Sequence, residues 1–288
     1  MLFLQVLVNG LLLGGVYACI AAGFSLVWGV LNVINIVHGS FIIIGSYAAY
    51  FAYIHLGIHP FLSVPIAAAI LFVIAYSFQS GIINKVVASP VLTTLTLTFG
   101  LELFVNNLLI IAFKADYRKV TLANPLGVLN LGGITIPLDR LAAMVLALVL
   151  TGLLFWVLGA SRIGRAIVAV RMDREAAALM GVKVKQIYAL TFGIGAVMAG
   201  AAGSLISLIF PISPLNSIMF LGKAFVICIL GGLGSVSGAM VGGLALGVLE
   251  SFGALAFGPE HAITLSFILL ILLLLFRPTG IMGKRGYE

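Results

Sequence analysis

The side chains that could do chemistry in this chain are few. The 288 residues include 8 Asp and Glu, 15 Lys and Arg, and 4 His. Glu102 lies near the middle of the apolar stretch 93–113, and the helical period places Thr98 and Asn106 on the same face, one turn to either side. A carboxyl group at this depth is costly if it faces lipid, so this face should turn toward protein or water. Two interpretations stay open: Glu102 lines a solute path, or it bonds a neighbouring helix.

A second polar group interrupts the apolar sequence at Leu31–Gly39. Asn32, Asn35 and His38 occur there without any formal charge. This pattern is compatible with a short broken or re-entrant segment that is shielded from lipid. A polar turn at the inner membrane surface is the alternative. His38 has no second potential ligand beside it, so it does not indicate a metal site.

The late part of the chain holds two charges within apolar segments, Lys223 and Glu250. Each would be expensive if buried alone, and pairing across two neighbouring helices lowers the cost. We therefore predict a structural ion pair, in preference to a proton relay. The sequence contains no Ser/His/Asp set and no cluster of metal ligands, and Cys19 and Cys228 are isolated. The chain is therefore expected to be no enzyme and to bind no metal or cofactor itself.

The elements that must position these groups are membrane-spanning helices. Hydrophobic residues make up 62% of the chain and charged residues 8%, against about 25% charged residues in a soluble domain. We predict an all-α polytopic membrane protein, a single transmembrane domain over residues 1–288, with about nine crossings and a range of roughly eight to ten. The expected spans are Gln5–Val30, Ser40–Ile54, Leu62–Phe78, Thr93–Phe113, Leu138–Leu158, Ile187–Phe210, two short or interrupted spans in the glycine-rich Ile218–Phe257, and Ala262–Phe276.

One of the few long breaks in this apolar sequence is Ser161–Ile187. It gathers the basic residues Arg162, Arg165, Arg171, Arg174, Lys183 and Lys185. Basic segments between apolar spans face the cytoplasm, which places the N-terminus outside and the C-terminus in the cytoplasm. The net charge of +7 is then explained by inner loops and lipid headgroups, and no nucleic acid is expected as a partner.

Within this break the sequence predicts a short helix, Arg174–Met180. Asp173 can cap its start, Glu175 favours the first turn, and Gly181 can end it. Ala176, Ala177 and Ala178 give the helix a small-sided surface that another protein could approach closely. We interpret the segment as a docking element for a cytoplasmic partner. A loop that only fixes the topology is the alternative.

The loop 114–137 is expected outside, although it carries Lys114, Arg118 and Lys119. The proposed inner side still holds more cations, because Lys85, Arg277, Lys284 and Arg285 add to the six of the 161–187 loop. Within the outer loop, Val128–Leu131 and Ile134–Ile136 flank Gly132-Gly133, which indicates a small β-hairpin. The hairpin is either a simple link or a surface for an external partner.

Four motifs occur in order along the chain: NVINIVHGSF (Asn32–Phe41), DREAAALMGV (Asp173–Val182), GKAFVICILGGLGSVSGAMVGG (Gly222–Gly243) and RPTGIMGK (Arg277–Lys284). In this combination the sequence resembles the permease subunits of ATP-binding-cassette importers for branched-chain amino acids, in particular the shorter, H-type subunit of high-affinity leucine, isoleucine and valine systems. The resemblance covers nearly the whole chain.

The resemblance implies a set of partners and a location. These are a second, similar permease in a heterodimer, two cytoplasmic ATPases that use the ATP, an external solute-binding protein, and the cytoplasmic (inner) membrane of a bacterium. It implies that the residues Asp173, Arg174, Glu175, Ala176, Ala177 and Gly181 belong to the helix that couples to an ATPase. It also implies a translocation path at the permease–permease interface, for which Asn32, Asn35, His38, Thr98 and Glu102 are the candidates.

A stand-alone secondary transporter or channel for a small polar solute is the alternative class. Its coupling ion would need intramembrane carboxyls, and Glu102 and Glu250 are too few and too far apart in sequence to argue for it. The cargo stays open among branched-chain amino acids, other amino acids, amides and urea, because the selectivity of importers usually lies in the binding protein.

Overall fold

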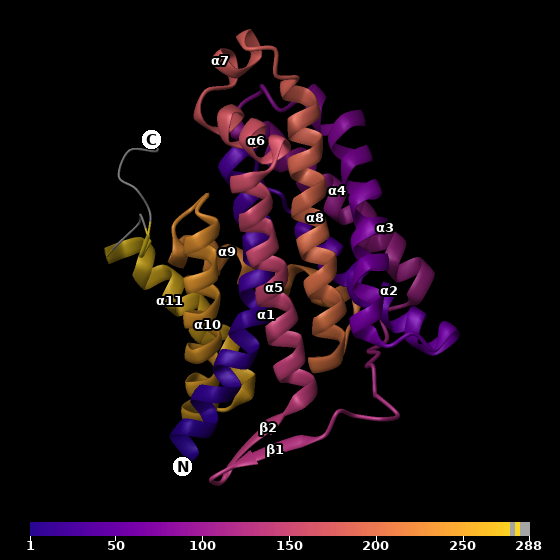
Figure 1. Cartoon of the computed structure of the whole chain (residues 1–288), viewed down its shortest axis with the longest axis vertical. Coiled ribbons are helices and arrows are strands. Elements are labelled where there is room, and N and C mark those ends of the chain that lie inside the picture. The colour runs from indigo at the N-terminus through magenta and orange to yellow at the C-terminus, as the bar shows by residue number, and fades with distance from the viewer. Residues whose placement is uncertain (277–279, 283–288) are drawn as a thin grey trace.

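The structure, a computed structural model, describes residues 1–276 and 280–282. Nine segments of this part of the chain are long and apolar enough to cross a membrane, as the sequence predicts. Their helices are α1 (Leu2–Leu31), α2 (His38–Leu56), α3 (Pro60–Gly81), α4 (Val91–Phe113), α5 (Leu138–Ala160), α8 (Val184–Ile209), α9 (Ser217–Gly231), α10 (Val236–Phe257) and α11 (Ala262–Phe276) (Figure 1). Arg277, Lys284 and Arg285, the basic residues predicted to face the cytoplasm near the C-terminus, lie outside the described residues.

The glycine-rich stretch 218–257 forms two helices, as expected, because the chain turns between α9 and α10. Gly232 and Gly234 adopt φ angles of 101° and 75° in this turn, a region that side chains other than glycine rarely enter. With 15 residues, α9 is about 22 Å long and is too short to cross the roughly 30 Å hydrocarbon core by itself. A non-helical segment must therefore complete this crossing.

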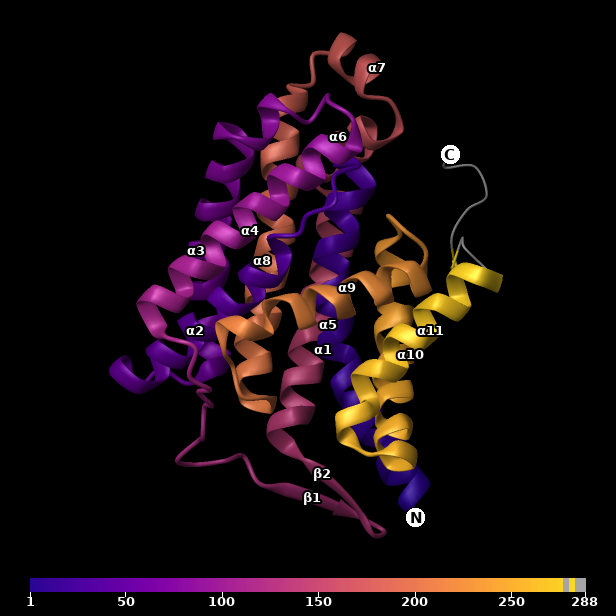
Figure 2. The same cartoon turned by 180° about the vertical axis from the view of Figure 1, so that it is seen from behind.

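Helix α1 runs through the middle of the bundle (Figures 1 and 2) and packs closely on α10. Gly10 and Gly14 of α1 face Gly243 and Gly247 of α10, so a GxxxG pair meets a GxxxG pair. A Cβ atom added to Gly14 would lie 2.8 Å from the Cα atom of Leu244. The two backbones are in contact, and this leaves no room for side chains at these four positions.

Helices α2 and α8 make a second close contact through reciprocal hydrogen bonds. Ser46 Oγ of α2 donates to the carbonyl oxygen of Gly203 at 2.8 Å, and Ser204 Oγ of α8 donates to that of Gly45 at 3.2 Å. Both glycines let the backbones approach closely enough for these bonds. Small residues and serines at helix contacts are typical of membrane bundles, since lipid provides no hydrophobic force between helices.

Residues 32–37 form the predicted break, and they return into the bundle without helical structure (Figure 2). Asn32 ends α1 in the left-handed region, with a φ of 52°. At the other end of the break, His38 Nε2 lies 3.0 Å from the carbonyl oxygen of Ile20. Since Ile20 precedes the end of α1 by 11 residues, the segment descends about 16 Å along α1 before α2 begins. Helix α2 therefore starts inside the bundle.

A second break, 210–216, precedes α9 and ends in the short turn η2 (Pro214–Asn216). The hydroxyl group of Ser217, the first residue of α9, donates a hydrogen bond to Glu102 Oε1, with an O···O distance of 2.8 Å. Glu102 is near the middle of α4, so α9 also starts inside the bundle. The break is held in place by backbone hydrogen bonds between Arg118 and Ile212, at 2.9 and 2.7 Å. The structure thus contains two crossings that each combine an extended segment with a helix.

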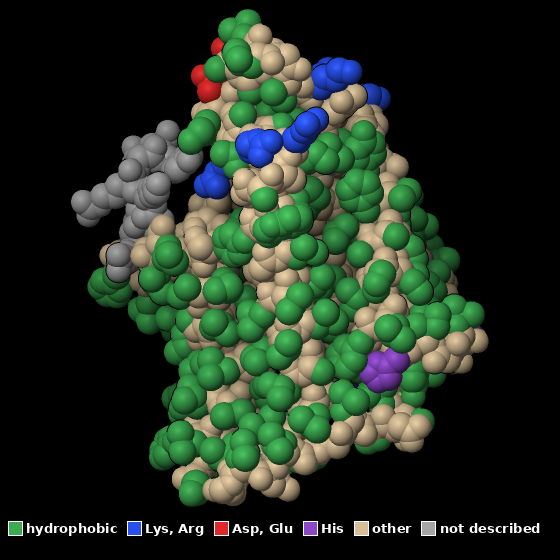
Figure 3. Space-filling view, in the orientation of Figure 1, with side chains coloured by type: hydrophobic (Ala, Val, Ile, Leu, Met, Phe, Trp, Pro, Cys, Tyr) green, Lys and Arg blue, Asp and Glu red, His purple; other side chains and the backbone are tan. Residues whose placement is uncertain are grey.

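The two ends of the bundle differ. One end carries the N-terminus and the hairpin of β1 (Val128–Leu131) and β2 (Ile134–Pro137), which is antiparallel as predicted (Figure 1). Gln5 of α1 fixes this hairpin through hydrogen bonds of 2.8 and 2.7 Å to the backbone of Thr135. The other end carries the short helices α6 (Arg162–Met172) and α7 (Arg174–Leu179). On the face shown in Figure 3, Lys and Arg side chains gather at this end, and hydrophobic side chains cover the middle of the molecule.

Candidate functional site

Helix α7 has the local structure that its sequence predicts. Asp173 Oδ1 accepts hydrogen bonds from the backbone N–H groups of Glu175 and Ala176, at 2.8 and 3.0 Å. These bonds satisfy donors that have no partner within the helix. The helix ends at Leu179, and Gly181 follows with a φ of 83°. The chain then turns back into α8, so α7 projects from the end of the bundle (Figure 1).

The expected contact face of α7 is exposed at Ala176 and Ala178 but not at Ala177. We expected Ala176, Ala177 and Ala178 to contact a partner, but Ala177 is 5% exposed and packs in the hydrophobic core of the chain. Its burial follows from the short connections at either side, which press one side of the helix onto the bundle. The apolar side chains that do protrude are Leu179 and Met180, at 89% and 85% exposure.

Sequence reasoning missed α6, the helix that precedes α7. Its signal is present: Ser161 Oγ caps the start by accepting from Gly164 N–H at 2.8 Å, and Ile167 and Val170 are buried at helical spacing. Its outer face carries Arg162 and Arg165, which stay exposed. The amphipathic α6 lies at the edge of the bundle and supports α7.

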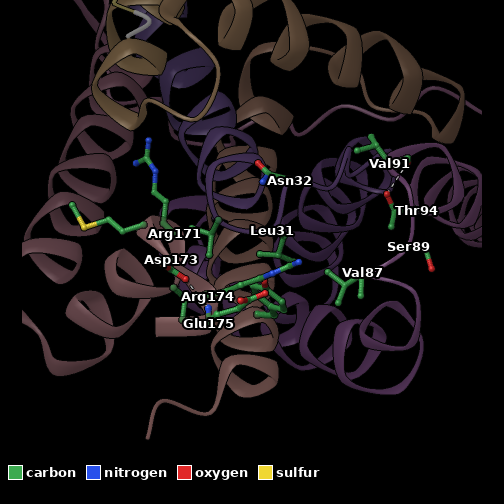
Figure 4. Close-up of a pocket in the computed structure, with 15 residues that line it drawn as sticks. Leu31, Asn32, Val87, Ser89, Val91, Thr94, Arg171, Asp173, Arg174 and Glu175 are labelled. Atoms are coloured by element: carbon green, nitrogen blue, oxygen red, sulfur yellow. Dashed lines mark hydrogen bonds between the residues drawn. The ribbon is translucent and has the colours of Figure 1, made fainter. Parts of the chain in front are cut away.

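A cavity of about 410 Å³ opens between α7 and the start of α4 (Figure 4). Asp173, Arg174 and Glu175 line one side, and the loop before α4 lines the other with Val87 and Ser89. The end of α1 lies between the two sides. The cavity also includes Asn32, Thr94, Arg171 and Tyr188. Asn32 therefore belongs to the α7 end of the molecule, and is separated from the other polar residues of its motif.

Thr98 and Glu102 lie inside the bundle, on the only face of α4 whose side chains are buried in the described structure. Thr98 Oγ1 donates to the carbonyl oxygen of Ile34 at 2.7 Å, and thereby holds the first break. Glu102 is 2% exposed and accepts from Ser217 at the start of α9. Ser40, in the first turn of α2, presents its hydroxyl and its backbone N–H to the same carboxyl group. Glu102 thus lies where both interrupted helices begin.

Asn35 and His38 are buried close to this position, at 1% and 0% exposure. Neither contacts Glu102 through a hydrogen bond in the described structure. The amide oxygen and nitrogen of Asn35, Nδ1 of His38, Oγ of Ser40 and Oε2 of Glu102 have no hydrogen-bond partner among the described residues. Polar atoms buried without partners are uncommon in folded proteins and mark places that bind water or solute.

Lys223 and Glu250 meet in a separate cluster. Lys223 Nζ lies 2.8 Å from Glu250 Oε2, so the contact expected between them is present, while its role in assembly stays a prediction. Tyr17 of α1 donates its hydroxyl to Glu250 Oε2 at 2.8 Å and accepts from Lys223. Ser266 of α11 donates to Glu250 Oε1 at 2.8 Å. Sequence reasoning missed Tyr17 and Ser266, because neither has a polar neighbour that would distinguish it.

The interrupted helices, the buried polar face of α4 and the projecting α7 define a class of protein: an α-helical membrane permease with the architecture of ABC importers. A solved structure supports the fold. It is described as PsaBC from Streptococcus pneumoniae in complex with Fab, and the similarity has a TM-score of 0.52 at 13% identity, over 97% of this chain and 93% of that one.

The sequence identifies the family. The family described as branched-chain amino acid transport system / permease component matches residues 6–276, and the chain belongs to it. The permease protein BraD of Pseudomonas aeruginosa, named for high-affinity branched-chain amino acid transport, is 37% identical over 99% of this chain and 97% of its own length. LivH of Escherichia coli, with the same transport system in its name, is 34% identical over the same shares. The family consists of transport permeases, and the chain is not an enzyme.

Proposed function

We propose that this chain imports branched-chain amino acids across the inner membrane as one permease of a heterodimer. Two cytoplasmic ATPases hydrolyse the ATP, and an external binding protein delivers the cargo. The names of the relatives support the cargo class, since BraD and LivH are named for this transport over nearly their full lengths. The observation in this chain that carries the proposal is α7, a capped helix that projects from the bundle with apolar side chains.

Helix α7 is the proposed contact with an ATPase. Leu179 and Met180 protrude at 89% and 85% exposure, and Met172, which precedes the cap of α7, is 81% exposed. Apolar side chains this exposed, surrounded by charged residues, mark surfaces that bind other proteins. Asp173 and Glu175 add negative charge at the helix start, where the helix dipole favours it. Ala177 anchors the helix from inside. The proposed docking face consists of the exposed residues Asp173, Arg174, Glu175, Ala176, Ala178 and Leu179.

The α7 end is proposed to face the cytoplasm, with the N-terminus outside and the C-terminus inside. The basic residues of α6, α7 and the loops beside them support this orientation. Arg118, at the opposite end, runs against the rule, but its guanidinium lies 5.5 to 6.0 Å from the ring centroids of Phe51, Tyr50 and Tyr47. It also donates to the carbonyl oxygen of Phe113 at 3.0 Å. A cation with these fixed contacts has a local role and says little about topology.

The proposed path passes the buried polar face of α4. Thr98 and Glu102 contact both breaks there, and Asn35 and His38 lie buried beside them. Asn32 belongs to the path only at its inner end, where it lines the cavity beside α7. Non-helical backbone at membrane depth is tolerated where it is buried in protein or lines a path, which supports this placement.

Replacing Gly181 with valine tests the coupling. Gly181 has a φ of 83°, and a Cβ atom there would meet nothing within 4 Å, so the substitution acts only through backbone strain. Gly159→Val is the matched control, because Gly159 also has open space around it but lies within α5. We expect leucine uptake by the reconstituted complex to fall at least about tenfold for Gly181→Val, with ATP hydrolysis no longer stimulated by the loaded binding protein.

Assembly is measured separately, as the amount of ATPase that copurifies with each permease variant. Uptake by the Gly181→Val complex at the rate of the Gly159→Val complex would overturn the role of α7. If the complex with the unchanged chain imports none of leucine, isoleucine and valine, the cargo assignment is wrong.

A further inference from the structure

The carboxyl group of Glu102 lies in the interior of the bundle without a balancing charge. It is 2% exposed, and within the described residues it forms no ion pair, because Lys223, the nearest cation along α9, pairs with Glu250. Glu102 Oε1 accepts from Ser217, while Oε2 has no partner. A buried carboxylate is strongly destabilising unless a cation or several donors compensate it. The groups that face this carboxyl, the Ser217 hydroxyl and the hydroxyl and N–H of Ser40, are neutral donors. The carboxyl group therefore still lacks a cation and can receive a positively charged group.

Donors for a negatively charged group lie beside the same carboxyl. Neither α2 nor α9 has a side-chain cap at its start. The first N–H group of each helix is already bonded, because His38 donates to Asn35 and Ser217 donates to Pro214. The N–H groups that follow in each first turn have no partner within the helix, and the positive ends of two helix dipoles meet here. The helix starts are in contact, since a Cβ atom on Gly39 would collide with the carbonyl oxygen of Ser217. Ser40 adds a fully buried hydroxyl that faces the Glu102 carboxyl without reaching hydrogen-bond geometry.

We propose that Glu102 and the starts of α2 and α9 form a binding site for the charged head of a free α-amino acid. The Glu102 carboxylate pairs with the ammonium group of the cargo, and the N–H groups of the two helix starts hold its carboxylate. Helix starts that face an anionic group are an effective way to bind it where water is scarce. The inference rests on the proposed function, because it takes the cargo to be an amino acid.

The site is closed in this structure, and α4 is the element that can open it. Along α4 a single stripe is buried, with Thr94, Thr98 and Glu102 among its members. The flanking side chains Phe99, Leu103 and Phe104 are exposed at 45 to 58%. A helix held along one stripe can move away from α2 and α9 without disturbing the core around α1. Such a movement exposes Glu102 and both helix starts together.

The test compares three ligands on the assembled complex in nanodiscs, without the binding protein. Leucine carries both charges, leucine methyl ester lacks the carboxylate, and 4-methylpentanoate lacks the ammonium group. Saturation-transfer NMR titrations measure the affinity of each. We expect leucine to bind at least about tenfold more tightly than either analogue. The carboxylate analogue leaves the Glu102 carboxylate without a cation, and the ester leaves the N–H groups of the helix starts without an anionic acceptor.

Glu102→Gln assigns the difference to one residue. The amide keeps an acceptor for Ser217 and nearly the same shape, but removes the charge. We expect leucine affinity to fall at least about tenfold. The affinity of 4-methylpentanoate should not fall, because the variant removes a negative charge beside its carboxylate. Glu260→Gln, at an exposed position in η3 (Pro259–His261), is the matched control. If Glu102→Gln weakens both ligands equally or neither, Glu102 is a structural cap and the proposal is wrong.

The wild-type series keeps the test decisive if the variant does not fold. Equal affinity of the unchanged complex for leucine and 4-methylpentanoate overturns the proposal by itself. A complex that imports leucine but shows no such discrimination retains the proposed function and loses this site. A complex that imports no branched-chain amino acid loses the proposed function instead.

Discussion

The Lys223–Glu250 pair offers a quantitative test of how the late helices are held together. The two side chains are 7% and 5% exposed, and their charged atoms are 2.8 Å apart. The pair joins α9 to α10, Tyr17 connects it to α1, and Ser266 connects it to α11. We predict that reversing either charge alone, as Lys223→Glu or Glu250→Lys, strongly destabilises the permease. Reversing both should restore most of the stability.

The expected magnitude follows from the burial. Breaking a buried pair by removing one partner costs about 3–5 kcal/mol, and solvent screening reduces this little where so small a part of each side chain is exposed. A single reversal also places two like charges in contact, so the loss of stability should be at least about 3 kcal/mol. This loss lowers the folded-to-unfolded ratio by at least about a hundredfold. In the double variant Tyr17 can still donate to the carboxylate and accept from the ammonium. The loss of the Lys223 contact with the Phe210 ring, at 5.9 Å, leaves a residual cost of about 1 kcal/mol.

The measurement is equilibrium unfolding of the purified permease in mild detergent by increasing sodium dodecyl sulfate, followed by tryptophan fluorescence. Glu260→Lys, an exposed reversal, controls for the change in net charge and should leave the midpoint nearly unchanged. A double variant that is no more stable than the weaker single variant would refute direct stabilisation by the pair. The buried charges would then be tolerated by the bundle without holding it together.

Two further predictions concern the break and the helix contacts. In a background without the native cysteines, Asn32→Cys should react with a water-soluble thiol reagent at rest, because Asn32 lines the cavity. Asn35→Cys, 1% exposed in the wild-type chain, should react only during ATP-driven turnover, and protection throughout turnover would remove Asn35 from the path. Gly203→Ala should lower the free energy of unfolding by about 1–3 kcal/mol, and with it the unfolding temperature, because the new methyl group collides with the Ile42 carbonyl. Gly100→Ala, with open space around it, should not.

The sequence predicted the elements whose signals are local. Apolar stretches long enough to span a bilayer predicted about nine crossings, and the described part of the chain has nine such segments. Gly132-Gly133 between two β-rich segments indicated the hairpin. The cap and the ending of α7 followed from Asp173 and Gly181, since each acts within one helical turn. Three polar residues in the apolar stretch Leu31–Gly39 indicated either a break or a polar turn, and the structure has the break, at 32–37.

Features that depend on the packing of distant segments were not predictable in this way. The burial of Ala177 depends on how α7 leans on the bundle, and nothing in three successive alanines distinguishes the middle one. Tyr17 and Ser266 join the ion pair from helices that are far from it in sequence. The meeting of α2 and α9 at Glu102 depends on two breaks that descend to the same depth. The periodicity of one segment does not predict how deep in the membrane a neighbouring break will end.

Helix α4 connects the two regions that transport must couple. Its first turns reach the cavity beside α7 through Thr94, and the same buried stripe contacts the first break through Thr98 and the start of α9 through Glu102. These residues are spaced by one helical turn each, and a helix transmits displacement along its axis with little loss. A shift of α7 against the loop before α4 therefore acts on both interrupted helices at once. The proposed opening of the site and the proposed docking of an ATPase thus involve one rigid element, α4. A variant in which α4 no longer contacts this loop should still bind cargo, but ATP hydrolysis should no longer drive cargo uptake.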